Sequence, residues 1–254
     1  MNIEHISVSR YQVFKECPVK YKYRYHLAIK PDKPEPFYFT YGKIIHKIAE
    51  EYVSKRGERV IGDIARDVLR GKIEIEPGRK APDVPNDYAR RMTGHLRAIQ
   101  DLTSKIGTNG ELEYKFHYDL DPPNGKYITG FIDRFIQNGD KAFIIDYKTT
   151  KKGNFRKTRS NIMHDLQLRA YAKVIQKDFN LKAENIKAAL YYLEGADLIA
   201  TSFTQQSIDT AEAELLKAYN EIAAADSEKV WGRVGNHCDR CDYNNICPFY
   251  NIQI

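Results

Sequence analysis

Gly130-Phe131-Ile132-Asp133 and Ile144-Ile145-Asp146-Tyr147-Lys148 are the two stretches that decide the fold of this 254-residue chain. Each reads as a β-strand, and Asn138-Gly139 between them is typical of a tight turn. Because side chains alternate along a strand, Asp146 and Lys148 point to the same face. An acid and an amine on one mostly apolar face are costly to bury unpaired. We therefore expect two adjacent strands to bring two carboxylates and an amine to one functional site.

Two further patterns accompany this pair of strands. Taken alone, an Asp-x-Lys at a strand end could be a simple cross-strand ion pair. However, Gly42 and His46 form a GxxxH pattern in a helical stretch upstream, and Gln167 and Tyr171 lie four residues apart on a helix face downstream. GxxxH, GxxD, DxK and QxxxY thus follow one another in order, which favours a catalytic interpretation.

The chemistry that these residue types suit is metal-dependent cleavage of a phosphodiester. Such a bond is anionic, so a divalent cation must neutralise its oxygens and lower the pKa of bound water before hydrolysis proceeds. Carboxylates and backbone carbonyls are hard ligands that suit Mg²⁺ or Mn²⁺. One imidazole among them makes Mn²⁺ at least as good a fit, and both ions remain open.

The series of motifs resembles the PD-(D/E)xK nuclease superfamily, in particular its RecB-like branch, over nearly the whole chain. This resemblance implies a central mixed sheet flanked by helices. It implies metal ligation by His46, Asp133, Asp146 and the carbonyl of Tyr147. Lys148 would orient the attacking water and stabilise charge on the phosphate. The QxxxY residues Gln167 and Tyr171 would lie beside the metal and contact DNA.

The four cysteines form a second feature. Cys17 stands alone, while Cys238-x2-Cys241-x5-Cys247 comes near the other end. The first residues are too polar for a signal peptide, so we expect a reducing cytoplasm and free thiols rather than disulfides. Four thiolates suit either tetrahedral zinc or a 4Fe-4S cluster, and His237 could replace one thiolate.

The cysteine spacing resembles that of iron-sulfur RecB-type nucleases, including AddB-like subunits and the fourth family of CRISPR-associated proteins. This resemblance favours a 4Fe-4S cluster, with zinc as the alternative. We expect its role to be structural, because its ligands come from distant parts of the sequence.

Basic residues gather directly after the second strand. The net charge of +6 agrees only weakly with a polyanionic partner. More specifically, the segment contains no acid and could follow a phosphate backbone through Lys151, Lys152, Arg156, Lys157 and Arg159. The first helix also mixes aromatic and basic residues, as in stacking on single strands, although we interpret Tyr11, Phe14 and Tyr21 as a buried stripe.

The periodicity predicts helices around a core of about five strands. Together with the resemblance, which implies a restriction-endonuclease-like core, we expect an α/β fold (mixed α+β) with a central, roughly five-stranded mixed sheet. A helical N-terminal insert and a C-terminal cysteine cluster would complete it. Helices are expected at residues 9–27, 38–55, 61–70, 87–105, 162–179 and 208–225. Strands are expected at residues 111–118, 126–137, 141–149, 186–194 and 198–203.

We expect one nuclease domain over residues 1–254. Its parts would be an N-terminal helix with the first cluster cysteine (1–30), a helical region (38–106), the nuclease core (107–230) and the cluster segment (231–254). Within the helical region, residues 57–106 would cover the site. Glu113 could help a second metal ion, but we favour its pairing with a lysine.

The expected function is a metal-dependent deoxyribonuclease that acts as an exonuclease on single-stranded DNA or DNA ends. The 5′ to 3′ polarity rests on the resemblance alone. The sequence has no P-loop and no membrane-spanning run, so unwinding would need a partner helicase, and CRISPR integration proteins are another possible partner. Repair or recombination, phage DNA processing (in a host cytoplasm) and CRISPR adaptation all fit. The alternative is a non-catalytic DNA-end-binding or assembly subunit stabilised by a metal cluster.

Overall fold

The computed structural model describes residues 1, 3–31, 34–151, 153 and 156–250. They divide into two compact units. The sheet unit consists of Pro36–Lys115 and Phe131–Ile208, and the terminal unit consists of Met1–Glu35, Phe116–Gly130 and Asp209–Ile254.

Helices and strands follow the expected order with shifted boundaries. The α-helices are α1 (Val8–Glu16), α2 (Pro18–Tyr21), α3 (Phe37–Ser54), α4 (Ile61–Leu69), α5 (Asn86–Ile106), α6 (Leu166–Phe179) and α7 (Gln205–Ala224). The strands are β1 (Glu111–Asp121), β2 (Lys126–Asn138), β3 (Lys141–Lys148), β4 (Ile186–Tyr192) and β5 (Asp197–Ser202).

The five strands form one mixed sheet in the order β1-β2-β3-β4-β5. β3 is antiparallel to β2 and parallel to β4, and β5 is antiparallel to β4. A parallel pair needs a crossover connection, and α6 supplies it between β3 and β4. The predicted mixed α/β fold with about five strands is confirmed.

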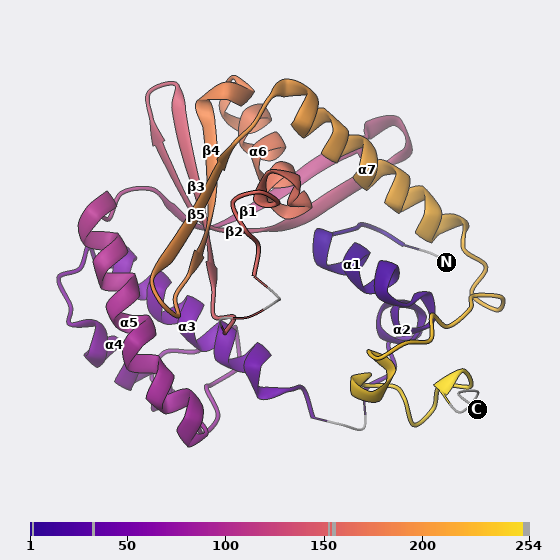
Figure 1. Ribbon diagram of the computed structural model, residues 1–254, viewed down its shortest axis with the longest axis horizontal. Helices are drawn as coiled ribbons and strands as arrows, with labels where there is room; N and C mark the ends of the chain where they lie inside the picture. The colour runs from indigo at the N-terminus through magenta and orange to yellow at the C-terminus, as the bar shows by residue number, and fades with distance from the viewer. Residues whose placement is uncertain (2, 32–33, 152, 154–155, 251–254) are drawn as a thin grey trace. The chain divides into compact units, whose positions relative to one another are not determined.

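In the sheet unit, helices cover both faces of the sheet (Figure 1). Apolar residues of α3, α4 and α5 form one core with Ile145 and Tyr147 of β3 and Tyr191 of β4. The Tyr191 hydroxyl also donates a hydrogen bond to the carbonyl of Ala98 in α5. Helix α6 packs against β3 and β4. Since Tyr147 faces the α3–α5 core, alternation turns Asp146 and Lys148 toward the opposite face.

The terminal unit joins segments from both ends of the sequence. The N-terminal amine donates to the carbonyls of Ala223 and Ala225, near the end of α7. The main chain at Ile6 pairs in parallel with Ile128 of β2. At Gly130, the glycine of the GxxD motif, a Cβ atom would come within 2.8 Å of the Phe116 ring. Only glycine lets that ring pack so closely on the strand.

The expected continuous helix over residues 9–27 is wrong. Helix α1 ends at Glu16, and Cys17 is extended, with φ −159° and ψ 117°. Proline disfavours a helical conformation in the residue before it but suits the first position of a new helix, where Pro18 lies. A turn of π-helix then covers Lys22–His26. Cys17 therefore lies at a break between two helices.

None of the helices among the described residues is long and apolar enough to cross a membrane.

Candidate active site

Strands β2 and β3 bring the two aspartates together. In their antiparallel register Arg134 lies opposite Ile145, so the adjacent residues Asp133 and Asp146 form the next opposed position. Asp133 Oδ2 accepts a hydrogen bond of 2.7 Å from the backbone N–H of Tyr147. The side chain of Asp133 is 11% exposed and that of Asp146 4%. Two carboxylates are thus held almost out of water within one antiparallel pair.

His46 of α3 lies beside the same two strands. Its Nε2 lies 2.9 Å from the carbonyl oxygen of Tyr147, and its Nδ1 lies 3.4 Å from Asp133 Oδ1. Burial alone would favour the neutral ring, but the Asp133 carboxylate outweighs it and raises the pKa of His46 to about 9. The imidazole therefore bridges two expected metal ligands as a cation.

Lys148 is held by groups on both sides. Its Nζ forms a 2.6 Å ion pair with Asp146 Oδ2 and donates to Gln167 Oε1 at 3.2 Å. Gln167 Nε2 in turn donates to the Tyr171 hydroxyl at 2.8 Å. The QxxxY residues thus form a hydrogen-bonded chain from α6 to the lysine of the DxK motif. Whether Gln167 and Tyr171 also contact DNA stays a prediction.

Glu113 belongs to this group as well. Oxygen or nitrogen atoms of His46, Glu113 and Asp133 all lie within 4.8 Å of one another, and this is the one such metal-binding set found among the described residues. We expected Glu113 to pair with a lysine, but the described contacts contain no such pair. Its backbone has φ 47°, a left-handed conformation that non-glycine residues rarely adopt. Neither charge pattern nor periodicity reveals this conformation; the only sequence signal is an acid in the strand preceding GxxD.

The carboxyl groups differ in their affinity for protons. Burial raises the pKa of Asp146 to about 6, in spite of the neighbouring Lys148. Burial and the nearby Asp133 carboxylate raise the pKa of Glu113 to about 7. Burial acts in the same direction on Asp133, but His46 reverses it and holds the pKa of Asp133 below its usual value. Crowded acids of this kind are typical of sites that bind a cation.

The basic segment after β3 is partly engaged by the protein itself. Arg156 donates to the carbonyls of Thr150 and Glu194, and its guanidinium stacks on the Tyr192 ring. Lys157 Nζ lies 3.6 Å from Asp165 Oδ2 and forms an ion pair with it. Lys152 lies outside the described residues. DNA contact by this segment, which also includes Lys151 and Arg159, stays a prediction.

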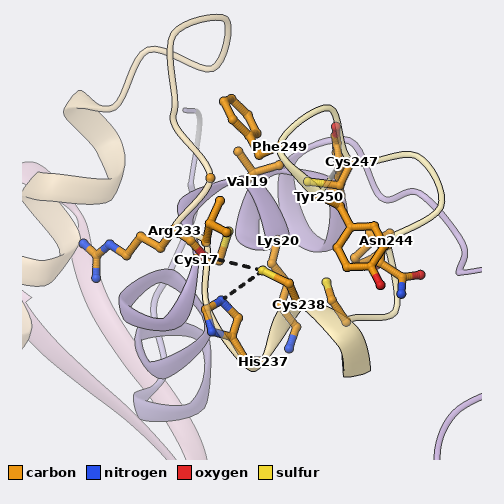
Figure 2. Close-up of a pocket in the computed structure, with 15 residues that line it drawn as sticks. Cys17, Val19, Lys20, Arg233, His237, Cys238, Asn244, Cys247, Phe249 and Tyr250 are labelled. Carbon is orange, nitrogen blue, oxygen red and sulfur yellow. Dashed lines mark hydrogen bonds between the residues drawn. The ribbon is translucent and has the colours of Figure 1, made fainter. Parts of the chain in front are cut away.

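In the terminal unit, the four cysteines line one pocket (Figure 2). All four are free thiols, and Cys17 is buried at the break between α1 and α2. Cys238 Sγ lies 3.8 Å from the carbonyl of Arg233 and 3.8 Å from His237 Nε2. The thiols far apart in sequence are thus brought to one place.

Comparison with known proteins decides the family. A model of the PD-(D/E)XK nuclease superfamily matches residues 5–248. The chain belongs to this superfamily. Relatives of the PD-(D/E)XK chain include a subunit of an ATP-dependent helicase/deoxyribonuclease of Clostridium perfringens, at 22% identity in strain SM101 and 23% in strain 13. Each alignment covers 96% of this chain and 24% of the relative. The chain therefore spans about a quarter of the length of these curated relatives.

The fold of this PD-(D/E)XK protein has a counterpart among solved structures. The crystal structure of a "putative exonuclease" from Eubacterium rectale superimposes with a TM-score of 0.56 at 14% sequence identity. The superposition covers 96% of this chain and 89% of the other. At this low sequence identity, the structural similarity shows a shared fold only.

Proposed function

We propose that this chain is a divalent-metal-dependent DNA nuclease, and that it acts as an exonuclease on single-stranded DNA or DNA ends. The observation that carries the proposal is the convergence of Asp133, Asp146 and Lys148 with His46 and the carbonyl of Tyr147. Membership of a nuclease superfamily supports the same chemistry. The 5′ to 3′ polarity is the least supported part of the proposal.

The donor set fits Mg²⁺ or Mn²⁺. Asp133, Asp146, Glu113 and the Tyr147 carbonyl offer hard oxygen atoms, and His46 offers one nitrogen, a mixture that suits either ion. When bound, the ion would neutralise phosphate oxygens and lower the pKa of a bound water.

We propose that Lys148 acts on the phosphate as well as pairing with groups of the protein. Asp146 and Gln167 fix its ammonium group at two of its three hydrogens, which leaves one donor for a phosphate oxygen or for the attacking water. Burial disfavours the charged amine, but Asp146 outweighs burial and raises the pKa of Lys148 above its ordinary value. Lys148 therefore stays a cation that can stabilise negative charge as it develops.

We further propose that Cys17, Cys238, Cys241 and Cys247 hold a 4Fe-4S cluster with a structural role. Four thiols that line one pocket suit either this cluster or zinc. The preference for the cluster over zinc rests on the resemblance of the cysteine spacing to that of iron-sulfur RecB-type nucleases. Free thiols also agree with a cytoplasmic setting.

Unwinding of duplex DNA would come from a partner. The curated relatives are named as subunits of a helicase/deoxyribonuclease, while this sequence carries no P-loop motif. We therefore propose that the chain works on strands opened by a helicase, in repair, phage DNA processing or CRISPR adaptation. Residues 1–254 would act as a single nuclease domain.

The test is cleavage of end-labelled single- and double-stranded DNA by anaerobically purified protein, with and without Mn²⁺. We expect Mn²⁺-dependent shortening of the single strand, lost in Asp146→Ala. Activity that survives Asp146→Ala would come from a contaminant. Binding of DNA ends without cleavage would favour the non-catalytic assembly subunit instead. Absorbance near ~400 nm that bleaches on oxidation would identify the iron-sulfur cluster, and bound zinc in a colourless protein would exclude it.

A further inference from the structure

A separate pocket of about 470 Å³ lies in the sheet unit, between α5 and the turn that joins β4 to β5. One face of α5 lines it with three arginines, a histidine and a glycine, and residues 193–196 line the other side. Arg90, Arg91, Gly94, His95 and Arg97 share this face because they follow helical spacing. None of these residues belongs to the proposed metal site.

His95 forms part of the wall of this pocket. The residue is 1% exposed, and its Nδ1 lies 3.0 Å from the Tyr41 hydroxyl. Nε2 has no partner among the described residues. Burial, assisted by Arg91, lowers the pKa of His95 to about 4, so the ring is neutral. The buried ring therefore adds no charge to the pocket wall.

The charges that surround His95 leave a positive surplus. Arg91 donates to Glu194 at 2.9 Å and to the carbonyl of Thr149 at 2.8 Å. Asp101, the other acid in the lining, forms a 2.7 Å ion pair with Lys105. No carboxylate in the described part of the chain pairs with Arg90 or Arg97. Both acids are thus neutralised while two guanidinium groups remain available.

Gly94 opens the helix surface in the middle of this pocket. Glycine inside a helix lowers stability relative to alanine, and packing does not require it here, because an added Cβ atom would have nothing within 4 Å. Its missing side chain lets a ligand approach the helix closely between Arg90 and Arg97.

We propose that this pocket binds a phosphate group of a single-stranded nucleic acid. Guanidinium groups match phosphate geometry, and Arg90 and Arg97 are both exposed on the face of α5 that lines the pocket. The pocket also adjoins the strand that carries Lys148, since the N–H of Leu193 donates to the Lys148 carbonyl at 3.0 Å. The choice of a nucleic-acid strand rests on the proposed function; a free nucleotide is the other source of the same phosphate chemistry.

The first test measures binding of a fluorescent oligothymidylate in EDTA, where no metal-dependent cleavage occurs. We expect Arg90→Gln/Arg97→Gln to raise Kd about tenfold and to lower the slope of log K against log salt by ~1.4, about 0.7 for each lost phosphate contact. The control Arg66→Gln/Arg70→Gln removes the same charge from exposed positions on or next to α4 and should change neither quantity. Equal losses in both double variants, or none, would overturn the proposal.

The second test fills the pocket. Gly94→Leu should keep or raise Tm, because leucine is a better helix former, but should weaken oligothymidylate binding. Gly62→Leu is the matched control, since Gly62 is also exposed in a helix with nothing within 4 Å of an added Cβ. If Gly94→Leu binds oligothymidylate with wild-type affinity, the proposal is contradicted, whatever the Tm of the variant.

The third test separates the two phosphate sources. Oligothymidylate should shift the side-chain Nε resonances of Arg90 and Arg97 in wild-type protein, and thymidine monophosphate should do so only weakly. A site that takes thymidine monophosphate while oligothymidylate binding is unaffected by Arg90→Gln/Arg97→Gln would overturn the assignment to a strand. Because these measurements need no cleavage, they can succeed even if the nuclease assay fails.

Discussion

His46 Nε2 lies 2.9 Å from the carbonyl oxygen of Tyr147, so two of the expected metal ligands are hydrogen-bonded to each other. The same ring faces the Asp133 carboxylate through Nδ1. A proton on this imidazole therefore occupies a position between hard ligands where a divalent cation would fit. Metal and proton compete for the site.

Binding of Mn²⁺ should tighten as the pH rises from 7 to 9. The pKa of His46 is raised to about 9, so at neutral pH the ion must displace a proton, and affinity should grow by up to about tenfold per pH unit. Isothermal titration calorimetry in two buffers of different ionisation heat would show about one proton released. His46→Ala should bind more weakly, and the pH dependence that remains should lie near pH 7, where Glu113 loses its proton. A constant affinity over this range, without buffer dependence, would show that His46 gives up no proton to the metal.

Lys148→Ala should lower the cleavage rate more than Gln167→Ala. The first change removes the cation expected to stabilise the phosphate, for which losses of about 10² to 10³ are usual. The second leaves Lys148 paired with Asp146 at 2.6 Å and removes only one of its two restraints, so we expect roughly a tenfold loss. Single-turnover cleavage at saturating Mn²⁺ measures both. Gln167→Glu, which keeps an acceptor for Lys148, should recover most of the rate; equal losses for all three variants would refute a positioning role for Gln167.

Glu113→Gly should weaken Mn²⁺ binding without lowering the thermal stability of the metal-free protein. Glycine accepts the φ of 47° that strains a glutamate, while the carboxylate near His46 and Asp133 is lost. Differential scanning fluorimetry in EDTA and a Mn²⁺ titration check the two halves. Glu111→Gly, at an exposed position of the same strand, is the control and should leave Mn²⁺ affinity unchanged. If Glu113→Gly binds Mn²⁺ like the wild type, Glu113 is not a ligand.

Cys17→Ala should lower Tm and nuclease activity together and give colourless protein. Cys17 lies at the break between α1 and α2 and lines the same pocket as Cys238, Cys241 and Cys247. A cluster bound there would therefore connect the N-terminal and C-terminal segments of the terminal unit. Metal analysis, absorbance and thermal melting of the same preparation check this. Wild-type Tm and full activity in a colourless variant would defeat the structural role.

Much of the sheet could be predicted because alternation and turn residues are local signals. The Asn138-Gly139 turn and the apolar runs before Asp133 and Asp146 are sufficient to place β2 and β3 side by side. The helix break at Cys17 also has a local cause, but the helical pattern of the surrounding residues led us to expect a continuous helix. Pro18 restricts Cys17, and helical periodicity on both sides hides that restriction.

Other features could not be predicted because they depend on contacts between distant residues. Arg156 lies in a basic segment that suggests DNA binding, but its guanidinium donates to the carbonyl of Glu194, 38 residues away. Glu113 becomes a candidate metal ligand only because α3 brings His46 close to it in the folded chain. The pocket of His95 and Arg91 combines α5 with a turn about a hundred residues later, and no motif connects the two.

Anomalous diffraction from a crystal of this protein containing Mn²⁺ tests the metal site most directly. We expect one strong peak with ligand distances of about 2.2 Å to Asp133, Asp146, the Tyr147 carbonyl and His46, with the imidazole turned from the carbonyl to the ion. A peak away from these four groups, or none at saturating Mn²⁺, would contradict the assignment of this site as the centre of a metal-dependent nuclease.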